Sequence, residues 1–430
     1  MIVTINPSWN DYAYTIADFS EIDCIAIREL ADAEGPQTLS RILLLTIANG
    51  TKLGVLEAIQ LLQQRSDIYC VEPNYILSVC TDIDYSVLPA LEPNDPKYDN
   101  NEQWAIDKIG LPYAWNVTTG SSSVLVGVID SGIDATHPDL ANNVNTSLSR
   151  CFSPDYSTAL QDASGHGTLV AGIIGAQGNN SMGVSGACWN VQLVSLRVAN
   201  TSGNFYLSGI IEAINYADEK GIPILNLSSA YDAYSNSDLN NLRNAIANYD
   251  GLFVTAAGNN ANNNDLTPYY PGNFRMTHLI CVGGSTATDN KRSSSNYGAT
   301  TVDIFAPGEN IMTTQTNNRY GNATGTSMAA PYVAGVAALL KSLDPSITAQ
   351  QIKYHIEEFA TPAPAFNGMC VTNGRLDAYM AVCTHTYSFS AEDWTYHSGN
   401  CICGAIRREE HKWRDIGGLQ MCAECGYVYG

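Results

Sequence analysis

From about residue 104 onward, short apolar runs alternate with longer segments of mixed polarity. The apolar runs occupy residues 123–130, 191–198, 223–229, 252–259 and 279–284. The segments 167–176 and 206–221 have the spacing of apolar positions expected of helices. Continuous apolar strands separated by helices are typical of a parallel sheet that is covered on both faces. The pattern therefore predicts an α/β domain with a doubly wound, mostly parallel sheet.

The first 80 residues carry a smaller pattern of their own. Residues 41–48 and 67–79 are strand-like, and residues 52–65 form an amphipathic helical pattern. Together they predict a small α+β unit. Residues 80–103 are rich in Asp, Asn and Pro, which is typical of a linker. We therefore expect a first domain with its linker over 1–90 and a second domain over 91–382.

Composition and charge narrow the class of protein. Of the 430 residues, 45% are hydrophobic and 15% are charged, which is enough apolar material for a large core. The net charge of −21 argues against nucleic acid and anionic membranes as partners. No apolar stretch reaches transmembrane length. No signal peptide is visible, so both an intracellular location and a secreted or cell-surface protein with an upstream start stay open.

The last 48 residues, 383–430, differ from the rest in their cysteines. Two pairs, Cys401-x-Cys403 and Cys422-x-x-Cys425, resemble the spacing of zinc ligands, and three histidines lie in the same segment. Disulfides are the alternative, especially in an oxidising environment. The sequence leaves both open and predicts a small Cys/His-rich module.

Polar residues stand where the predicted strands end, which is where ligands of such sheets bind. Asp130 ends one strand, and Asn259 closes another. Ser327 lies in "GTSMAAPYVAGVAALL", at the start of a helix with small side chains that allow close packing. We expect Pro331 in the first turn of this helix, where its missing amide is tolerated. Taken alone, each of these residues has a structural reading as well, such as a turn residue or a helix cap.

Four segments together resemble the subtilisin-like serine peptidase family. They are "VIDSGIDATHPDL" with Asp130, "SGHGTLVAG" with His166, "TAAGNN" with Asn259 and "GTSMAAP" with Ser327. The match includes the family's four functional positions in the order Asp, His, Ser, and it extends over residues 93–382. The resemblance implies a subtilisin-like fold and a Ser-His-Asp triad that hydrolyses peptide bonds through an acyl-enzyme. A catalytically silent binding protein on the same fold is the alternative, although it has no chemical need for all four residues.

The chemistry explains why these residue types are needed. Ser327 is a poor nucleophile until His166 accepts its proton, and Asp130 would orient and stabilise the imidazolium. Asn259 would donate its amide to the oxyanion, together with the backbone N–H of Ser327. The glycines at 165, 167 and 325 are expected to leave room for a peptide backbone.

The resemblance also implies where substrate and calcium bind. An extended peptide would pair with two strand edges and therefore be cut with broad specificity. The expected substrate-binding residues are Gly203, Asn204, Phe205, Ser228, Ser229, Ala230 and Gly258. Asp95 of "PNDPKY", Asp139 of "HPDL" and Asn180 of "NNSMGV" match calcium ligands, and hard oxygen donors suit that ion.

Finally, the strand 67–79 resembles the last strand of a subtilisin prodomain, which covers the active site and is then cut off. The resemblance thus implies a self-processing zymogen in which the first domain is an intramolecular inhibitor. The resemblance implies a cut close to Cys80, and any position from about Val79 to Glu92 would fit. We expect a monomer that acts on protein or peptide substrates.

Overall fold

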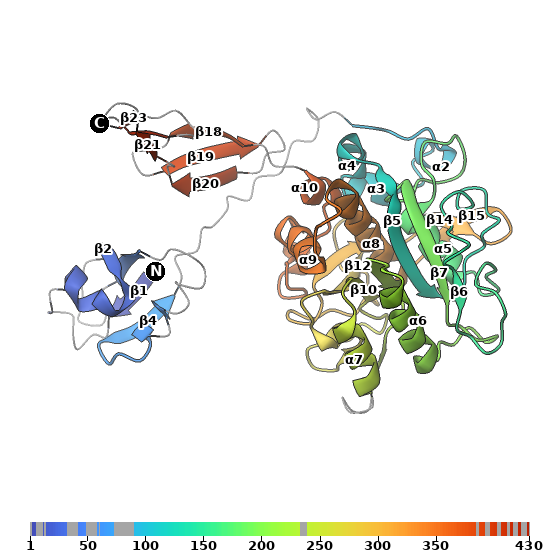
Figure 1. The fold of residues 1–430 in the computed structure, drawn as a ribbon, viewed down its shortest axis with the longest axis horizontal. Coiled ribbons are helices and arrows are strands. Elements are labelled where there is room, and N and C mark those ends of the chain that lie inside the picture. Colours follow the sequence, from blue (N-terminus) through green and yellow to red (C-terminus); the bar gives the residue numbers. More distant parts are fainter. Residues whose placement is uncertain are drawn as a thin grey trace. The chain divides into compact units, whose positions relative to one another are not determined.

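The computed structural model describes residues 2–5, 12, 14–31, 42–48, 58–59, 61–72, 90–232 and 239–383, and the strands of a C-terminal segment from 387 to 429. The chain divides into two compact units, Met1–Thr81 and Asp82–Gly430. Figure 1 shows the elements of both units. The domain boundaries expected at residues 90 and 382 stay predictions.

The smaller unit is built on an antiparallel sheet with the strand order β2-β3-β1-β4. Its strands are β1 (Ile2–Ile5), β2 (Cys24–Ala31), β3 (Ile42–Ile47) and β4 (Ile68–Glu72), and the 3-10 helix η2 covers Ile16–Ile22. Leu43, Leu45 and Phe19 are buried in its core. Residues 73–80, which include the end of the predicted strand 67–79, lie outside the described residues.

A nine-stranded sheet forms the centre of the larger unit, with the order β16-β17-β13-β12-β10-β8-β5-β7-β6. The strands are β5 (Gly120–Asp130), β6 (Arg150–Cys151), β7 (Asn190–Arg197), β8 (Ile224–Leu227), β10 (Leu252–Ala256), β12 (Leu279–Ser285), β13 (Ile304–Pro307), β16 (Thr361–Pro362) and β17 (Gly374–Arg375). Neighbours from β6 to β17 pair in parallel, and β16 joins the edge antiparallel. The predicted parallel sheet is confirmed.

Helices bury both faces of this sheet (Figure 1). One apolar cluster joins Val254 of β10 to α5 (His166–Gly175) and α8 (Thr326–Leu343). A second cluster joins the adjacent residue, Phe253, to α6 (Leu207–Glu219) and α7 (Asn240–Asn248). Successive side chains of a strand point to opposite faces, so the two clusters lie on opposite sides of the sheet. This is the reason why the strands are apolar throughout.

The remaining elements surround this core. They are α2 (Pro96–Asp99), α3 (Trp104–Lys108), α4 (Leu111–Val117), β9 (Tyr231–Asp232), β11 (Tyr269–Tyr270), η5 (Gly272–Phe274), β14 (Ile311–Gln315), β15 (Arg319–Ala323), α9 (Ala349–Glu358), η6 (Pro364–Phe366) and α10 (Ala378–Val382). The C-terminal segment forms two antiparallel sheets, β18-β19-β20 and β21-β22-β23. Their strands are β18 (Tyr387–Ala391), β19 (Tyr396–Cys401), β20 (Ile406–Glu410), β21 (Trp413–Asp415), β22 (Gln420–Cys422) and β23 (Val428–Tyr429).

Helix α8 is buried along most of its length, and its small residues allow this. A Cβ atom at Gly335 would lie 2.5 Å from the Cβ of Ala187, so a larger residue would force the helix away from its neighbour. The prediction for Pro331 was wrong. The helix begins at Thr326, which places Pro331 in its second turn, where it removes the hydrogen bond to the carbonyl of Ser327.

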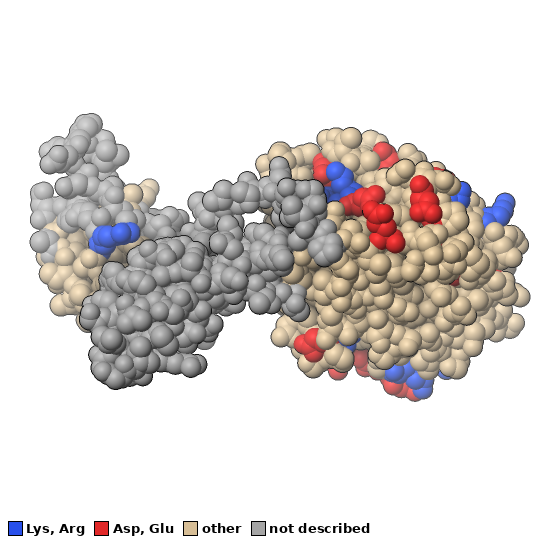
Figure 2. Space-filling view, turned by 90° about the horizontal axis from the view of Figure 1, so that it is seen from above, with Lys and Arg blue, Asp and Glu red and all other residues tan. Residues whose placement is uncertain are grey.

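Two surface features bear on partners. Across the described residues, no helix is long and apolar enough to cross a membrane. On the face in Figure 2, the described Lys and Arg residues are scattered and do not form a continuous patch.

Phe305 and Phe366 offer a test of the packing at the edge of the sheet. Their rings stack with centroids 4.5 Å apart, and both side chains are fully buried. Phe366→Ala is expected to lower the free energy of unfolding by about 3–5 kcal/mol, because it removes this contact and leaves a cavity. Thermal or urea unfolding would measure the change. Val371→Ala, at an exposed position, is the control and should change stability little; an equally small effect of Phe366→Ala would contradict the packing described here.

Candidate active site

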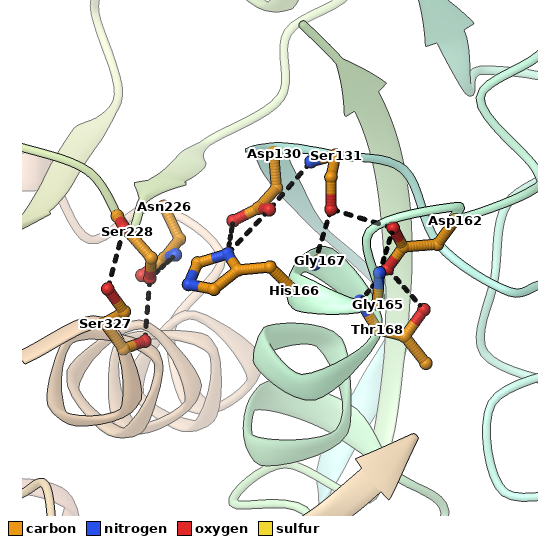
Figure 3. A network of polar contacts seen from close by, with 10 residues as sticks. All are labelled: Asp130, Ser131, Asp162, Gly165, His166, Gly167, Thr168, Asn226, Ser228 and Ser327. Atoms are coloured by element: carbon orange, nitrogen blue, oxygen red, sulfur yellow. Dashed lines mark hydrogen bonds and ion pairs between the residues drawn. The ribbon is translucent and has the colours of Figure 1, made fainter. Parts of the chain in front are cut away.

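The four predicted catalytic residues come from different elements that meet at the carboxyl edge of the sheet, and Figure 3 shows three of them, Asp130, His166 and Ser327. Asp130 is the last residue of β5, and His166 is the first of α5. Ser327 lies in the first turn of α8. Asn259 follows β10, in the loop that contacts the start of α8.

His166 is held by a buried carboxylate. Its Nδ1 lies 2.8 Å from Oδ1 and 3.0 Å from Oδ2 of Asp130. The backbone N–H of Ser131 donates to the same Oδ1 at 2.7 Å. A carboxylate accepts the Nδ1 proton, which leaves Nε2 as the basic nitrogen of the neutral ring. The charge of Asp130 raises the pKa of His166 above its usual value, although burial acts in the opposite direction.

Asp162, which none of the sequence motifs singled out, organises this corner of the site (Figure 3). Its carboxylate accepts hydrogen bonds of 2.8 Å from the hydroxyl of Ser131, the backbone N–H of Gly165, and both the N–H and the hydroxyl of Thr168. It therefore binds the unpaired N–H groups at the start of α5, as anions commonly do at a helix N-terminus. In the sequence, the sign of this role is that Asp162 stands shortly before a predicted helix.

Gly167 has another role than the one expected of it. A Cβ atom at Gly167 would lie 2.1 Å from the carbonyl oxygen of Gly132. Gly167 therefore allows α5 to approach the loop after β5 closely, rather than leaving room for a peptide. Gly165 has φ +86°, a conformation that glycine adopts most easily.

Ser327 and Ser228 form a reciprocal pair of hydrogen bonds. The hydroxyl of Ser327 donates to the carbonyl of Ser228 at 3.0 Å, and the hydroxyl of Ser228 donates to the carbonyl of Ser327 at 3.0 Å. Because Pro331 cannot donate to that second carbonyl, Ser228 supplies the hydrogen bond that the helix lacks. Asn226 holds the Ser228 hydroxyl at 2.8 Å.

The side-chain amide of Asn259 is oriented by three hydrogen-bond donors that face its oxygen. Its Oδ1 accepts from the backbone N–H of Thr326 at 2.9 Å, from the Thr326 hydroxyl at 3.3 Å, and from Nη2 of Arg292. Nδ2 is thereby left to face the open side. A Cβ at Gly325 would lie 3.6 Å from both Nδ2 of Asn259 and the backbone nitrogen of Ser327. These two nitrogens therefore lie near the same point beside Gly325.

The predicted substrate-binding residues fall into three segments. Ser228, Ser229 and Ala230 follow β8, and the structure brings Ser228 into contact with Ser327. Gly258 lies beside Asn259, with its N–H donating to Thr326. Gly203, Asn204 and Phe205 lie in the loop before α6, where hydrogen bonds to Asn200 close a turn.

The predicted calcium ligands lie close to one another. Two carboxylates, Asp95 and Asp139, are fully buried and linked by Asn180, whose N–H donates to Asp95 at 3.0 Å and whose Nδ2 donates to Asp139 at 3.0 Å. Within the described residues neither carboxylate forms an ion pair with Lys or Arg. Burial raises the pKa of Asp139. Two buried anions without a cationic side chain are a donor set that fits a hard cation.

The predicted zinc ligands cannot be placed in the same way. Cys403 and Cys425 lie outside the described residues, as do the side chains of Cys401 and Cys422. The described residues, those around Asp95 and Asp139 included, contain no group of three or more His, Cys, Asp or Glu side chains that could hold a metal ion.

Comparison with known proteins agrees with this geometry. The family model of the "Subtilase family" matches residues 121–377. The chain is 36% identical over 335 residues to "Thermophilic serine proteinase" of Bacillus sp. (strain AK1), covering 78% of each protein. It is 36% identical over 290 residues to "Thermitase" of Thermoactinomyces vulgaris, covering 67% of this chain and 99% of thermitase. A solved protease structure from Pseudoalteromonas arctica PAMC 21717 has a TM-score of 0.58 at 28% identity, covering 68% of this chain and 98% of that one.

The family model matches more than half of the chain, and both proteases named first are similar over two thirds of it or more. The chain therefore belongs to the subtilase family and is a subtilisin-like serine endopeptidase.

Proposed function

We propose that Ser327, His166 and Asp130 form the catalytic triad of this peptidase and that Asn259 stabilises the oxyanion. One observation supports this most strongly: both oxygens of the buried Asp130 carboxylate lie within 3.0 Å of Nδ1 of His166, which directs the basic Nε2 away from the carboxylate. This is the tautomer that a general base needs.

The reaction begins when the Ser327 hydroxyl leaves the carbonyl of Ser228 and donates to Nε2 of His166. Exchanging one neutral hydrogen bond for another costs about 1 kcal/mol or less. Ser327 Oγ then attacks the peptide carbonyl as His166 takes its proton, and Asp130 stabilises the imidazolium. His166 returns the proton to the leaving amine, and a water molecule hydrolyses the acyl-enzyme by the same route.

The negative charge that develops on the carbonyl oxygen needs its own partners. Nδ2 of Asn259 and the backbone N–H of Ser327 flank the space beside Gly325. Ser327 lies in the first turn of α8, where backbone N–H groups have no intrahelical acceptor. These two donors would bind the oxyanion more strongly than the neutral carbonyl, which is what lowers the barrier.

Substrate would bind as an extended chain between the segment 228–230 and the loop 203–205. Main-chain hydrogen bonds to such edges do not depend on side chains, so broad specificity follows. Ser229 and Ala230 lie immediately after β8, and Gly203, Asn204 and Phe205 form the opposite wall of this proposed cleft.

We also propose that calcium binds at Asp95 and Asp139, with Asn180 turning its oxygen toward the ion. The ion would neutralise the two buried carboxylates and join residue 95 to the loop that contains Asn180. Its role would be structural.

Three further proposals concern the whole chain. Residues 1–90 would act as a prodomain that inhibits the enzyme and is removed by it, and residues 91–382 would form the mature peptidase. The module 383–430 would hold zinc or disulfides. A secreted or cell-surface location and a monomeric state fit an enzyme of this kind that digests proteins.

The first test removes the nucleophile. Ser327→Ala is expected to abolish peptide hydrolysis without changing the fold, because one oxygen is lost, and to leave the chain full length. Mass spectrometry and N-terminal sequencing of the wild-type enzyme should find a start between Val79 and Glu92. Ser123→Ala, exposed in β5, is the control and should be processed normally. Appreciable turnover by folded Ser327→Ala protein would refute the triad.

The second test concerns pH. His166 must be neutral to act as a base, so activity should fall as the pH drops through its raised pKa. Asp130→Asn removes the charge that raises this pKa, and the acid limb of kcat/KM should therefore move to lower pH. kcat should also fall by about 10⁴-fold, because Asn favours the wrong tautomer. Asp155→Asn, at an exposed carboxylate, should leave both unchanged; an acid limb that stays in place in Asp130→Asn would contradict the assignment.

The third test concerns calcium. An ion at 100 times its Kd stabilises the folded state by about 2.7 kcal/mol, so a chelator should lower Tm. Asp139→Asn should lower Tm in the presence of calcium and make it insensitive to chelator. If the metal is removed completely, as measured by atomic emission, and the wild-type Tm does not move, the proposed structural role of calcium is wrong.

A further inference from the structure

Arg292, in the loop after β12, is a buried cation that touches the oxyanion donor. The residue as a whole is 7% exposed. Nη2 donates to Oδ1 of Asn259, and Nη1 donates to the hydroxyl of Ser294. Nε lies beside Gly284, where a Cβ would be 3.7 Å away, and has no hydrogen-bond partner among the described residues.

The charge of this guanidinium is not neutralised by direct contact. Within the described part of the chain, no carboxylate forms an ion pair with Arg292. Burial lowers the pKa of Arg292, and Glu309 opposes this effect without touching it. A buried charge paired with two neutral oxygens is costly in the resting enzyme. A negative charge that appears nearby during the reaction would offset that cost.

The hydrogen bond also decides which way the Asn259 amide faces. A guanidinium can donate but cannot accept, and the same is true of the backbone N–H of Thr326. The atom on which both converge must therefore be the amide oxygen. With the amide reversed, its NH₂ group would face two donors, and its oxygen would face the space where the oxyanion forms.

The loop that carries Arg292 is fixed to the loop that carries Asn259. The N–H of Arg292 donates to the carbonyl of Gly284 at 2.9 Å. Nζ of Lys291 closes the Arg292 loop through the carbonyls of residues 292, 293 and 295. Oδ1 of Asn296 accepts from the N–H groups of Asn260 and Asn262, next to Asn259. Arg292 is therefore held in place independently of Asn259.

We propose that Arg292 is a positioning residue for catalysis: it fixes Nδ2 of Asn259 toward the oxyanion and places a positive charge one hydrogen bond behind it. The charge is uncompensated in the resting state and compensated in the transition state, so it acts on kcat rather than on substrate affinity. This proposal rests on the oxyanion role of Asn259 proposed above.

Arg292→Met tests the proposal, because it removes both the charge and the hydrogen bond while keeping an apolar chain of similar length. kcat should fall by about 10- to 100-fold, less than the 10²–10³ expected for loss of the donor itself, with KM little changed. Arg292→Lys keeps a charge and a donor and should restore most of kcat. Active sites are counted with phenylmethylsulfonyl fluoride, so that unfolded protein does not enter kcat.

Binding of inhibitors gives a readout that does not depend on turnover. A peptidyl trifluoromethyl ketone forms an adduct with the catalytic serine that carries the oxyanion, whereas the corresponding peptide alcohol does not. Arg292→Met should weaken the ketone by about the same factor as kcat, and leave the alcohol unaffected. Equal weakening of both would mean that Arg292 shapes the substrate site instead, and would overturn the proposal.

A matched control and a double-mutant cycle separate the remaining explanations. Lys291→Met loosens the same loop and should lower Tm while keeping kcat within about threefold; a loss equal to that of Arg292→Met would attribute the effect to the loop. In an Asn259→Ala background, Arg292→Met should lower kcat by no more than about threefold, because the residue acts through Asn259. An undiminished effect in that background, or an unchanged kcat in Arg292→Met alone, would overturn the proposal.

Asn259→Ala by itself keeps the two proposals distinguishable. If it leaves kcat unchanged, the oxyanion role of Asn259 is wrong. If it lowers kcat while Arg292→Met does not, only the role of Arg292 is wrong. Should Arg292→Met fail to fold, Arg292→Gln, which keeps a polar group but no charge, goes through the same measurements with the same expectations.

Discussion

The hydrogen bonds between Thr326 and Asn259 hold the start of helix α8 against the loop after β10. The N–H and hydroxyl of Thr326 both donate to Oδ1 of Asn259, and the N–H of Gly258 donates back to that hydroxyl. Ser327, the next residue, is therefore placed relative to the amide of Asn259 by contacts that involve no substrate. Because α8 is also buried along most of its length, a shift of Ser327 would have to move the packed core of the sheet. Small residues such as Gly335 allow α8 to pack closely enough to be buried.

Charges of opposite sign lie on the two sides of the active site. Asp130 and Asp162 lie on the side of His166, and both favour its protonated form. Arg292 lies on the side of Asn259. The proposed reaction creates an imidazolium on the first side and an oxyanion on the second, so each developing charge meets a charge that is already in place. In a chain with a net charge of −21, a buried cation beside the proposed oxyanion donor is a local exception to the overall charge.

The sequence was sufficient to predict those parts of the molecule that are determined by short, continuous segments. Apolar runs predicted the parallel strands, and the four motifs identified residues that the structure brings to one edge of the sheet. Contacts between distant segments could not be read in this way: Arg292 is 33 residues from Asn259, and no local pattern links them. Pro331 shows a related limit. It is tolerated in the second turn of α8 because Ser228, 99 residues away in sequence from Ser327, donates to the Ser327 carbonyl in place of the missing N–H. Gly167 was interpreted as space for substrate because the nearby backbone of Gly132 is not visible in the sequence.

The resting site contains two arrangements that the transition state would resolve together. The hydroxyl of Ser327 is hydrogen-bonded to the carbonyl of Ser228 rather than to His166, and Arg292 is buried with no carboxylate partner in the described part of the chain. With a tetrahedral intermediate present, both the Ser327 hydroxyl and the Arg292 guanidinium would have more favourable interactions than these. In the proposed reaction, the proton of Ser327 would move to His166 and its oxygen would become part of the adduct, while the new oxyanion would face Nδ2 of Asn259 and, behind it, Arg292. These interactions would therefore stabilise the transition state more than the resting enzyme. An interaction that strengthens only in the transition state raises kcat without tightening the binding of substrate.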